Sequence, residues 1–397
     1  MPMLSKKALE GIAAYKYKSY VLLSLPACLP VGTYTFLDNQ LNHFWNAAVE
    51  LLPKWMAPNL VTMLGTVIMM LTTVVQLYYS PHLSEPAPAW VYLLSAVGLF
   101  LYQTLDALDG KQARRTGSSS PLGQLFDHGC DALCTVFNVL SAAATIQVGA
   151  SWGTFVALSS VSVAFFMAQW EEYHTGVMSC GNGYYGVTEG QLTLVAAHLV
   201  TALLGPGFWQ YSLPVIGLTP THVLILSLLG SNVFLVYGNI LNVLHTPLEA
   251  MPAAEAGHKQ REKPVALFQL VPLSIILALG AMWISGPNAD DYAKYPLVFL
   301  FAHGIAFVLF STRMIVSHMC KIPYTPQFRV IIPLMLLVLN SYGPSIELFS
   351  GPLLRPLVAS VMYSLVISCV YLHYVVHVVN DICNFLNIYL FKIKGKH

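Results

Sequence analysis

The chain has 397 residues, of which 56% are hydrophobic and only 9% are charged, whereas a soluble globular domain carries about 25% charged residues. A mean hydropathy of +0.63 and repeated apolar stretches of about 20 residues exclude an ordinary soluble protein and indicate a membrane protein with many spans. The net charge of +1 gives no indication of nucleic-acid binding, because the cations are scattered over short loops. We expect no nucleic-acid partner.

Amphipathic patterns come first along the chain, followed by a series of apolar segments. Residues 5–20 and 41–52 are amphipathic, which favours helices lying along the membrane surface. Each later apolar segment is predicted to be a helix, because lipid offers no partner to free backbone groups. The predicted fold is therefore all-α, a polytopic membrane protein with about ten transmembrane helices behind N-terminal interfacial helices. The ten predicted spans are residues 59–79, 88–108, 127–148, 152–172, 189–206, 222–245, 265–285, 295–318, 330–347 and 356–380.

The positive charges indicate how these spans are oriented. With ten crossings and a cytosolic N-terminus, 17 of the 19 Lys and Arg residues fall on the cytosolic side, and only Lys294 and Arg355 fall opposite. Such an excess is expected, because cytosolic loops are enriched in Lys and Arg. We therefore predict ten spans with both termini in the cytosol.

The chain is predicted to have four parts. Residues 1–52 form the interfacial N-terminal segment, and residues 53–245 form a six-helix unit. The polar stretch 246–264 predicts a cytosolic linker. Residues 265–397 then form a four-helix unit that ends in a basic tail.

Four of the eight aspartates in the chain lie between residues 106 and 131. Asp106 and Asp109 are three residues apart, and Asp127 and Asp131 are four apart, so each pair shares one helix face. The first pair lies at the predicted end of the second span and the other pair at the predicted start of the third. We expect all four carboxylates to converge at the cytosolic edge of the membrane.

Ionised acids in such a place are costly unless cations neutralise them. Oxygen ligands select hard ions such as Mg²⁺ or Mn²⁺, and four carboxylates suffice for two ions. A pair of metal ions suits displacement at phosphorus. Lys111, Arg114 and Arg115 add cations for phosphate oxygens, while Gly110 and Gly123 let a ligand or a helix approach closely.

Two other interpretations explain this cluster less well. The acids could pair with the adjacent cations and cap two helices, with Asp127 as a cap or first-turn residue, but this explains one carboxylate and not the spaced set. A cation transporter would place acids at mid-membrane depth on several helices. The four aspartates instead lie at one interface.

The aspartates follow the spacing D-x2-D-G-x2-A-R-x8-G-x3-D-x3-D. This string resembles the signature of the CDP-alcohol phosphotransferases at every defined position. The strings PKWMAPNLVTMLG (53–65), DGKQARRTGSSSPLGQLFDHGCDAL (109–133) and TEG (188–190) are similar to the eukaryotic choline/ethanolamine phosphotransferase branch, and the ten-span length fits that branch. The resemblance covers about residues 50–190.

The resemblance implies an enzyme, a diacylglycerol cholinephosphotransferase or ethanolaminephosphotransferase. The hydroxyl of diacylglycerol would attack the β-phosphorus of CDP-choline or CDP-ethanolamine, releasing CMP and forming phosphatidylcholine or phosphatidylethanolamine. The resemblance also implies two Mg²⁺ or Mn²⁺ ions, membrane lipids as partners, a homodimer, and the endoplasmic reticulum as location, with the Golgi as the alternative. A cytosolic active site suits a nucleotide substrate. A transferase of the same family that uses inositol or glycerol phosphate is the alternative function.

The resemblance also assigns roles to the acidic residues. Asp106, Asp109 and Asp127 match metal-binding positions, and Asp131 matches the fourth aspartate, taken as a metal ligand, the general base or both. His128 is the rival base, because an imidazole with a pKa of about 6.5 is suited to deprotonating a hydroxyl. Its alternative role is a hydrogen bond at a helix end. Because neighbours on a helix differ by about 100°, His128 need not face the metals.

Further residues match substrate positions of the family. Asn59, in PN-x-x-T, resembles a position near the nucleotide, with an N-cap after Pro58 as the alternative. Those near the CDP phosphates and cytidine are Gly110, Lys111, Arg114 and Gly123.

Two acidic segments are candidates for binding the ammonium group of the aminoalcohol. Glu189 begins the fifth predicted span. The string QWEEYH (169–174) puts acids beside aromatic residues, which suits choline. Interfacial aromatics that anchor a helix are the alternative for this string.

Overall fold

The computed structural model describes residues 3–15, 35–181, 185–214, 217–247, 262–325, 327–348 and 350–393. Within these ranges the regular elements are helices and no strand occurs, which confirms the all-α prediction. The α-helices in chain order are α1 (Lys6–Ala13), α2 (Phe36–Leu51), α3 (Pro58–Tyr79), α4 (Ala89–Thr116), α5 (Pro121–Thr145), α6 (Trp152–Thr175), α7 (Val187–Leu204), α8 (Pro220–His245), α9 (Lys263–Phe268), α10 (Val271–Trp283), α11 (Ala289–Lys294), α12 (Pro296–Met319), α13 (Phe328–Tyr342) and α14 (Pro356–Leu386).

Nine of the ten predicted spans are confirmed by length and hydropathy. Among the described residues, nine helical segments are long and apolar enough to cross a membrane, with α9 and α10 forming one of them. The tenth predicted span is α5, whose apolar residues are interrupted by Asp127, His128 and Asp131. It packs against α3, α6 and α12, so protein covers much of its surface. The architecture is that of a polytopic membrane protein.

Two predicted boundaries beside the aspartates are wrong. The second span is predicted to end at residue 108, but α4 continues to Thr116, where Gly117 caps it in the left-handed conformation (φ 63°). The third span is predicted to begin at residue 127, but α5 begins at Pro121 after its N-cap Ser120. The hydropathy pattern ends where charged residues begin, whereas a helix continues until residues that can cap it. All four aspartates therefore lie inside helices.

Both N-terminal helices dock on the bundle. Helix α1 lies within the predicted segment 5–20, of which residues 16–20 are outside the described residues. It packs near the end of α14, where Asp381 Oδ2 accepts hydrogen bonds from the N–H groups of Met3 (2.6 Å) and Leu4 (2.9 Å). Helix α2 begins five residues before the predicted segment 41–52, because Thr35 and Asp38 form a capping box.

The predicted six-helix and four-helix units share a hydrophobic core. Helix α12 packs against α5 and α6 as well as against α14. Trp170 Nε1 on α6 donates to the carbonyl of Ala266 (3.3 Å), and the Tyr173 hydroxyl donates to the carbonyl of Ile322 (3.3 Å). Most of the predicted linker, residues 248–261, lies outside the described residues. The C-terminal helices thus support α5 and α6 directly.

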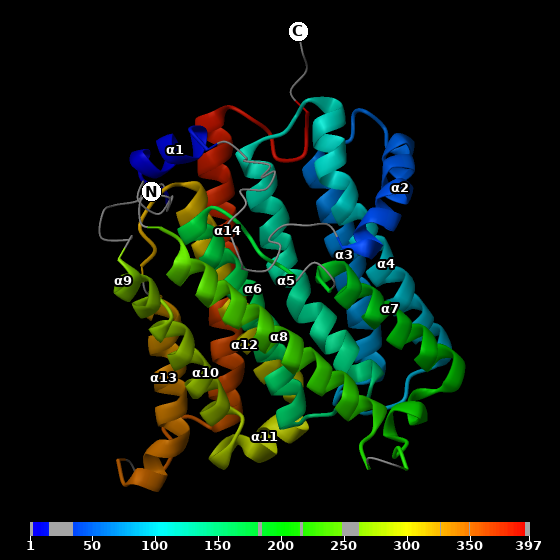
Figure 1. Cartoon of the computed structure of the whole chain (residues 1–397). Coiled ribbons are helices and arrows are strands. Elements are labelled where there is room, and N and C mark those ends of the chain that lie inside the picture. Colours follow the sequence, from blue (N-terminus) through cyan, green and yellow to red (C-terminus); the bar gives the residue numbers. More distant parts are fainter. Residues whose placement is uncertain are drawn as a thin grey trace.

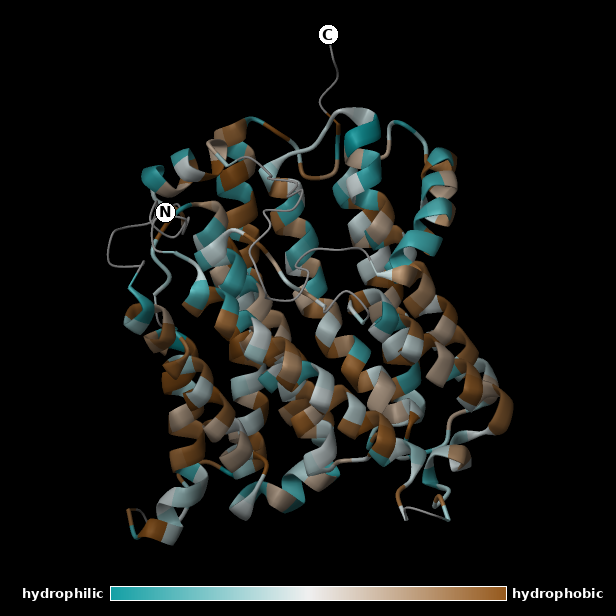
Figure 2. Cartoon of the chain, in the orientation of Figure 1, coloured by the Kyte–Doolittle hydropathy of each residue, from teal (hydrophilic) through white to brown (hydrophobic). Residues whose placement is uncertain are grey.

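The polar elements gather at one end of the bundle. Helices α1 and α2, the end of α4, the start of α5 and the C-terminal segment lie together at the top of Figure 1, and α11 lies at the opposite end. Hydrophilic colours concentrate at the same end in Figure 2, whereas apolar colours dominate the middle of the helices. This is the end that the sequence predicts to face the cytosol.

Candidate active site

Three aspartates converge from two helices. Asp106 and Asp109 lie one turn apart on α4, and one ligand oxygen of each lies within 4.8 Å of an oxygen of Asp127 on α5. Asp127 is well inside α5, whose N-cap is Ser120, so the interpretation of Asp127 as a helix cap is wrong. Helix α3 packs against both α4 and α5. Side chains from a third helix therefore reach this aspartate trio.

The oxygens of the aspartate trio have too few hydrogen-bond donors. Asp109 is 8% exposed and accepts a hydrogen bond from the Thr62 hydroxyl on α3. The Oδ1 atoms of Asp106 and Asp127 are buried and have no hydrogen-bond partner among the described residues. Buried carboxylates at this range repel one another, and a divalent cation would remove the conflict. An all-oxygen donor set fits Mg²⁺ or Mn²⁺, so these residues fit a metal ion.

Asp131 and His128 lie beside the trio on α5. Asp131 is not part of the trio, and its Oδ1 accepts a hydrogen bond from the Tyr102 hydroxyl on α4 (2.6 Å). His128 lies inside α5, and its Nδ1 is buried without a partner in the described part of the chain. The interpretation of His128 as a helix-end hydrogen-bonding residue is therefore wrong. Both side chains have an atom that can accept a proton.

The three cations between the aspartate pairs have different surroundings. Lys111 Nζ donates to Asn46 Oδ1 on α2 (2.7 Å), and Arg115 donates to backbone carbonyls at the end of α2. These two cations hold α2 against α4, so the expectation that Lys111 binds phosphate finds no support in its contacts. Arg114 is exposed and forms no hydrogen bond or ion pair with any described residue. Its Nη1 lies 3.6 Å from where a Cβ at Gly110 would be, so Arg114 is the cation available to an anionic ligand.

Asn59 lies in the first turn of α3, beside the start of α5. Ala57 is the N-cap of α3 and Pro58 its first residue, so the interpretation of Asn59 as the N-cap is wrong. Its Nδ2 donates to the carbonyl of Leu390 in the C-terminal segment (3.0 Å). Its Oδ1 lies 3.5 Å from where a Cβ at Gly123 would be. A Cβ at Gly123 would therefore be in ordinary van der Waals contact with the Asn59 oxygen.

Glu189 has one engaged oxygen and one free oxygen. It lies in the first turn of α7, where its Oε2 accepts a hydrogen bond from the N–H of Gly186 (2.9 Å). Its Oε1 is buried and has no partner among the described residues. The carboxylate thus caps its own helix through one oxygen and leaves the other without a partner in the described structure.

The acid and aromatic residues at 169–174 lie in the protein core. Trp170 is fully buried, so the interpretation of these aromatics as interfacial anchors is wrong. The carboxylate of Glu171 accepts hydrogen bonds from the side-chain amides of Asn239 and Asn242 on α8. Glu171 therefore joins α6 to α8 and is not free to bind an ammonium group.

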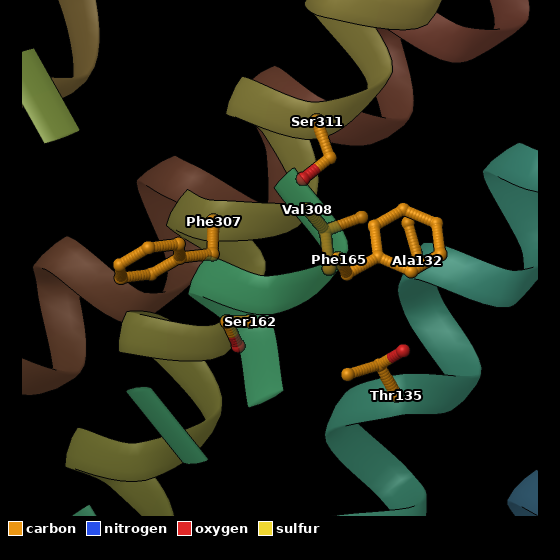
Figure 3. Close-up of a pocket in the computed structure, with 7 residues that line it drawn as sticks. All are labelled: Ala132, Thr135, Ser162, Phe165, Phe307, Val308 and Ser311. Carbon is orange, nitrogen blue, oxygen red and sulfur yellow. The ribbon is translucent and has the colours of Figure 1, made fainter. Parts of the chain in front are cut away.

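A small pocket lies between α5, α6 and α12 (Figure 3). Ala132, which lines the pocket, directly follows Asp131 on α5. Residues of α12 line another side of the pocket, although this helix carries no recognised sequence motif. The pocket is lined by Ala132, Thr135, Ser162, Phe165, Phe307, Val308 and Ser311. Apolar side chains and hydroxyls thus lie together close to the acidic residues in sequence.

Sequence reasoning missed two residues that orient the carboxylates. Thr62 is the threonine of PN-x-x-T, the string that contains Asn59 and resembles the family. Tyr102 lies four residues before Asp106. The i, i+4 spacing puts Tyr102 and Asp106 on one helix face, which is a readable signal. For the pairing of Thr62 with Asp109 the sequence offers no such spacing, because it joins two different helices.

Comparison with known proteins identifies the family to which this arrangement belongs. The model of the CDP-alcohol phosphatidyltransferase family matches residues 55–221, a range that includes every predicted site residue. The chain is also 32% identical to "Uncharacterized CDP-alcohol phosphatidyltransferase class-I family protein 1" of Dictyostelium discoideum, over 99% of this chain and 96% of that protein. The chain belongs to the CDP-alcohol phosphatidyltransferase family.

Relatives within the family include cholinephosphotransferases of several animals. Cholinephosphotransferase 1 of Danio rerio is 35% identical over 75% of this chain and 76% of that protein. Cholinephosphotransferase 1 of Homo sapiens is 34% identical over 78% of this chain and 74% of that protein. Family membership makes the chain a transferase of phospholipid biosynthesis and argues against the cation-transporter interpretation. CDP-alcohol phosphatidyltransferases use a divalent metal, which agrees with the aspartate trio.

Proposed function

We propose that the enzyme transfers phosphocholine or phosphoethanolamine from the CDP-alcohol to diacylglycerol. The aspartate trio carries the proposal, because it occurs in a chain similar to cholinephosphotransferases. The exposed cation Arg114 lies on the same helix as Asp106 and Asp109, with its Nη1 3.6 Å from the Cβ position of Gly110. A bond forms between the lipid oxygen and the β-phosphorus, and the bond from that phosphorus to the CMP oxygen breaks. The hydroxyl proton passes to the protein. The products are CMP and phosphatidylcholine or phosphatidylethanolamine.

The aspartates would hold two divalent ions in this reaction. Asp106, Asp109 and Asp127 form the trio that fits a metal, and Asp131 is the proposed fourth ligand. Bound there, Mg²⁺ or Mn²⁺ would stabilise negative charge on the phosphate oxygens. Thr62 orients Asp109 through its hydrogen bond, and partners of this kind hold a ligand in its binding orientation.

His128 and Asp131 are the two candidates for taking up the lipid proton. One oxygen of Asp131 already accepts a hydrogen bond from Tyr102, whereas Nδ1 of His128 has no partner in the described structure. Because a neutral imidazole accepts a proton near neutral pH, the unpartnered nitrogen favours His128 as the base.

The aminoalcohol would bind at Glu189, in the first turn of α7. The free Oε1 of Glu189 suits the ammonium group. We place the site on the cytosolic side of the endoplasmic reticulum membrane, with the Golgi as the alternative, in a homodimer. The distribution of Lys and Arg supports the cytosolic orientation.

A direct assay tests the proposal. The purified chain with Mg²⁺ and diacylglycerol should release CMP from radiolabelled CDP-choline or CDP-ethanolamine and form the labelled phospholipid. Competition between the two CDP-aminoalcohols gives the preferred substrate. The proposal fails if neither compound yields CMP. Turnover only with CDP-diacylglycerol as donor and inositol or glycerol phosphate as acceptor would instead support the alternative family activity.

The cations of α4 give a matched pair of variants. Arg114→Ala is expected to lower kcat/KM for the CDP-alcohol about 10- to 100-fold, because charge-assisted hydrogen bonds contribute about 1.5–3 kcal/mol. Lys111→Ala is expected to change kcat/KM by less than about threefold and to lower the melting temperature, because it loses hydrogen bonds to α2. Steady-state kinetics and thermal unfolding of both variants check this. Equal losses of kcat/KM in the two variants would contradict the assignment of Arg114, rather than Lys111, as the cation that binds the CDP-alcohol.

A further inference from the structure

The chain turns back toward the aspartate trio after its last helix. Helix α14 ends at Leu386, and Asn387 adopts the left-handed conformation (φ 51°). The N–H of Ile388 then donates to the carbonyl of Cys383 (3.1 Å), in the manner of a common helix-ending turn. This turn directs residues 390–392, here called the C-terminal strap, toward the first turns of α3 and α5.

Two contacts join the C-terminal strap to the site. The carbonyl oxygen of Leu390 accepts the hydrogen bond from Asn59 Nδ2 (3.0 Å), across 331 residues of sequence. The ring of Phe391 packs edge-on against that of Phe126, with centroids 5.8 Å apart and planes at 85°. Phe126 directly precedes Asp127 of the trio. The strap therefore touches α3 and α5 next to the metal-binding residues.

Further contacts hold the C-terminal strap and the residues that lead into it. The carboxylate of Asp381 ties the end of α14 to the N–H groups of Met3 and Leu4. Ile388 and Leu390 pack against the main hydrophobic core. Both ends of the chain thus contribute to the position of the strap.

The strap determines the direction of the Asn59 amide. A backbone carbonyl can only accept a hydrogen bond, so the NH₂ group of Asn59 must face Leu390. The Oδ1 atom then faces Gly123, 3.5 Å from its Cβ position, and has no hydrogen-bond partner among the described residues. An acceptor at this place suits cytosine, whose exocyclic amino group is a donor.

We propose that the C-terminal strap is a positioning element for the nucleotide. Through Leu390 it turns the Asn59 oxygen toward the cytosine amino group, and through Phe391 it braces the start of α5. The inference rests on the proposed function, since it needs a CDP-alcohol as substrate. It goes further by making affinity for the nucleotide depend on residues far from the aspartate motif, while lipid binding and the chemical step do not depend on them.

The test compares two aromatic residues two positions apart. Phe391→Ala removes the ring that packs on Phe126, whereas Tyr389→Ala removes a ring that is 64% exposed and has no ring contact with a described residue. With the full chain, Mg²⁺ and the better of CDP-choline and CDP-ethanolamine, Phe391→Ala should raise the KM for the nucleotide about 3- to 10-fold. Its kcat and its KM for diacylglycerol should stay near those of the wild type. Tyr389→Ala should leave all three parameters unchanged.

A double-mutant cycle links the strap to Asn59. The combined effect of Asn59→Ala and Phe391→Ala on the nucleotide KM should be smaller than the product of the two single effects, because residues that act through one arrangement are not additive. A chain that ends at Tyr389 should reproduce the raised KM.

The outcomes of these experiments distinguish failure of the proposed role of the strap from failure of the proposed function. An unchanged nucleotide KM in Phe391→Ala and in the shortened chain would overturn the role of the strap and leave the proposed function intact. A lower melting temperature with equal loss of kcat in Phe391→Ala and Tyr389→Ala would also overturn it, because that pattern indicates general destabilisation. A wild-type chain that turns over neither CDP-aminoalcohol refutes the proposed function, and the role of the strap with it.

Discussion

Asp127→Ala is expected to lower kcat about 10³-fold, the size of effect seen when one group that stabilises transition-state charge is removed. Asp127 supplies one of three ligand oxygens that lie within 4.8 Å of one another, and the two carboxylates left on α4 would hold a metal incompletely. The protein should stay folded, because Oδ1 of Asp127 has no hydrogen bond to lose in the described structure. Removing one buried charge also relieves repulsion within the trio.

Asp290→Ala is the matched control for this variant. Asp290 is an exposed aspartate on α11, at the opposite end of the bundle, so kcat should not change. Size-exclusion chromatography and thermal unfolding show whether both variants are folded. If Asp127→Ala keeps more than about a tenth of the wild-type kcat, the assignment of the metal ligands is wrong.

Removal of divalent metal with a chelator is expected to abolish CMP release and to lower the melting temperature. Ligand at about 100 times its Kd stabilises the folded state by about 2.7 kcal/mol, so adding back Mg²⁺ or Mn²⁺ should raise the melting temperature by several degrees. The effect has a structural reason, because a bound metal would neutralise the buried oxygens of Asp106 and Asp127 that lack donors.

Thermal unfolding without substrate separates this metal effect from turnover. Asp127→Asn removes one charged ligand and should nearly abolish the rise with Mg²⁺, while Asp290→Asn should behave like the wild type. An equal rise with Mg²⁺ in wild type and Asp127→Asn would place the metal elsewhere. An unchanged melting temperature of the wild type at millimolar Mg²⁺ would argue against metal binding by the aspartate trio.

The sequence predicted the existence of the helices better than the residues at which they begin and end. Apolar stretches of span length require helices in lipid, and this argument needs no knowledge of neighbouring segments. The ends of α4 and α5 depend instead on Gly117, Ser120 and Pro121, which cap helices beyond the hydropathy boundary. Hydropathy is a weaker guide for α5, because Asp127, His128 and Asp131 interrupt its apolar residues.

The site could be predicted in part, because some of its residues lie close together in the sequence. The spacing of Asp106 and Asp109 on one helix, and the short turn that leads to Asp127, bring the trio together through local geometry. The predicted phosphate contact of Lys111 found no support, because its amide partners belong to α2. The caps proposed for Asn59 and Asp127 were wrong because their helices begin earlier than expected.

The amino-acid sequence by itself determined that the chain is a helical membrane protein with an acidic cluster of the CDP-alcohol phosphatidyltransferase type. Both conclusions depend on composition and short-range spacing, which a sequence displays directly. Only the tertiary structure decided that Tyr102 and Thr62 orient the carboxylates and that Leu390 holds Asn59. These contacts join different helices across as many as 331 positions, and packing of the whole bundle brings them together.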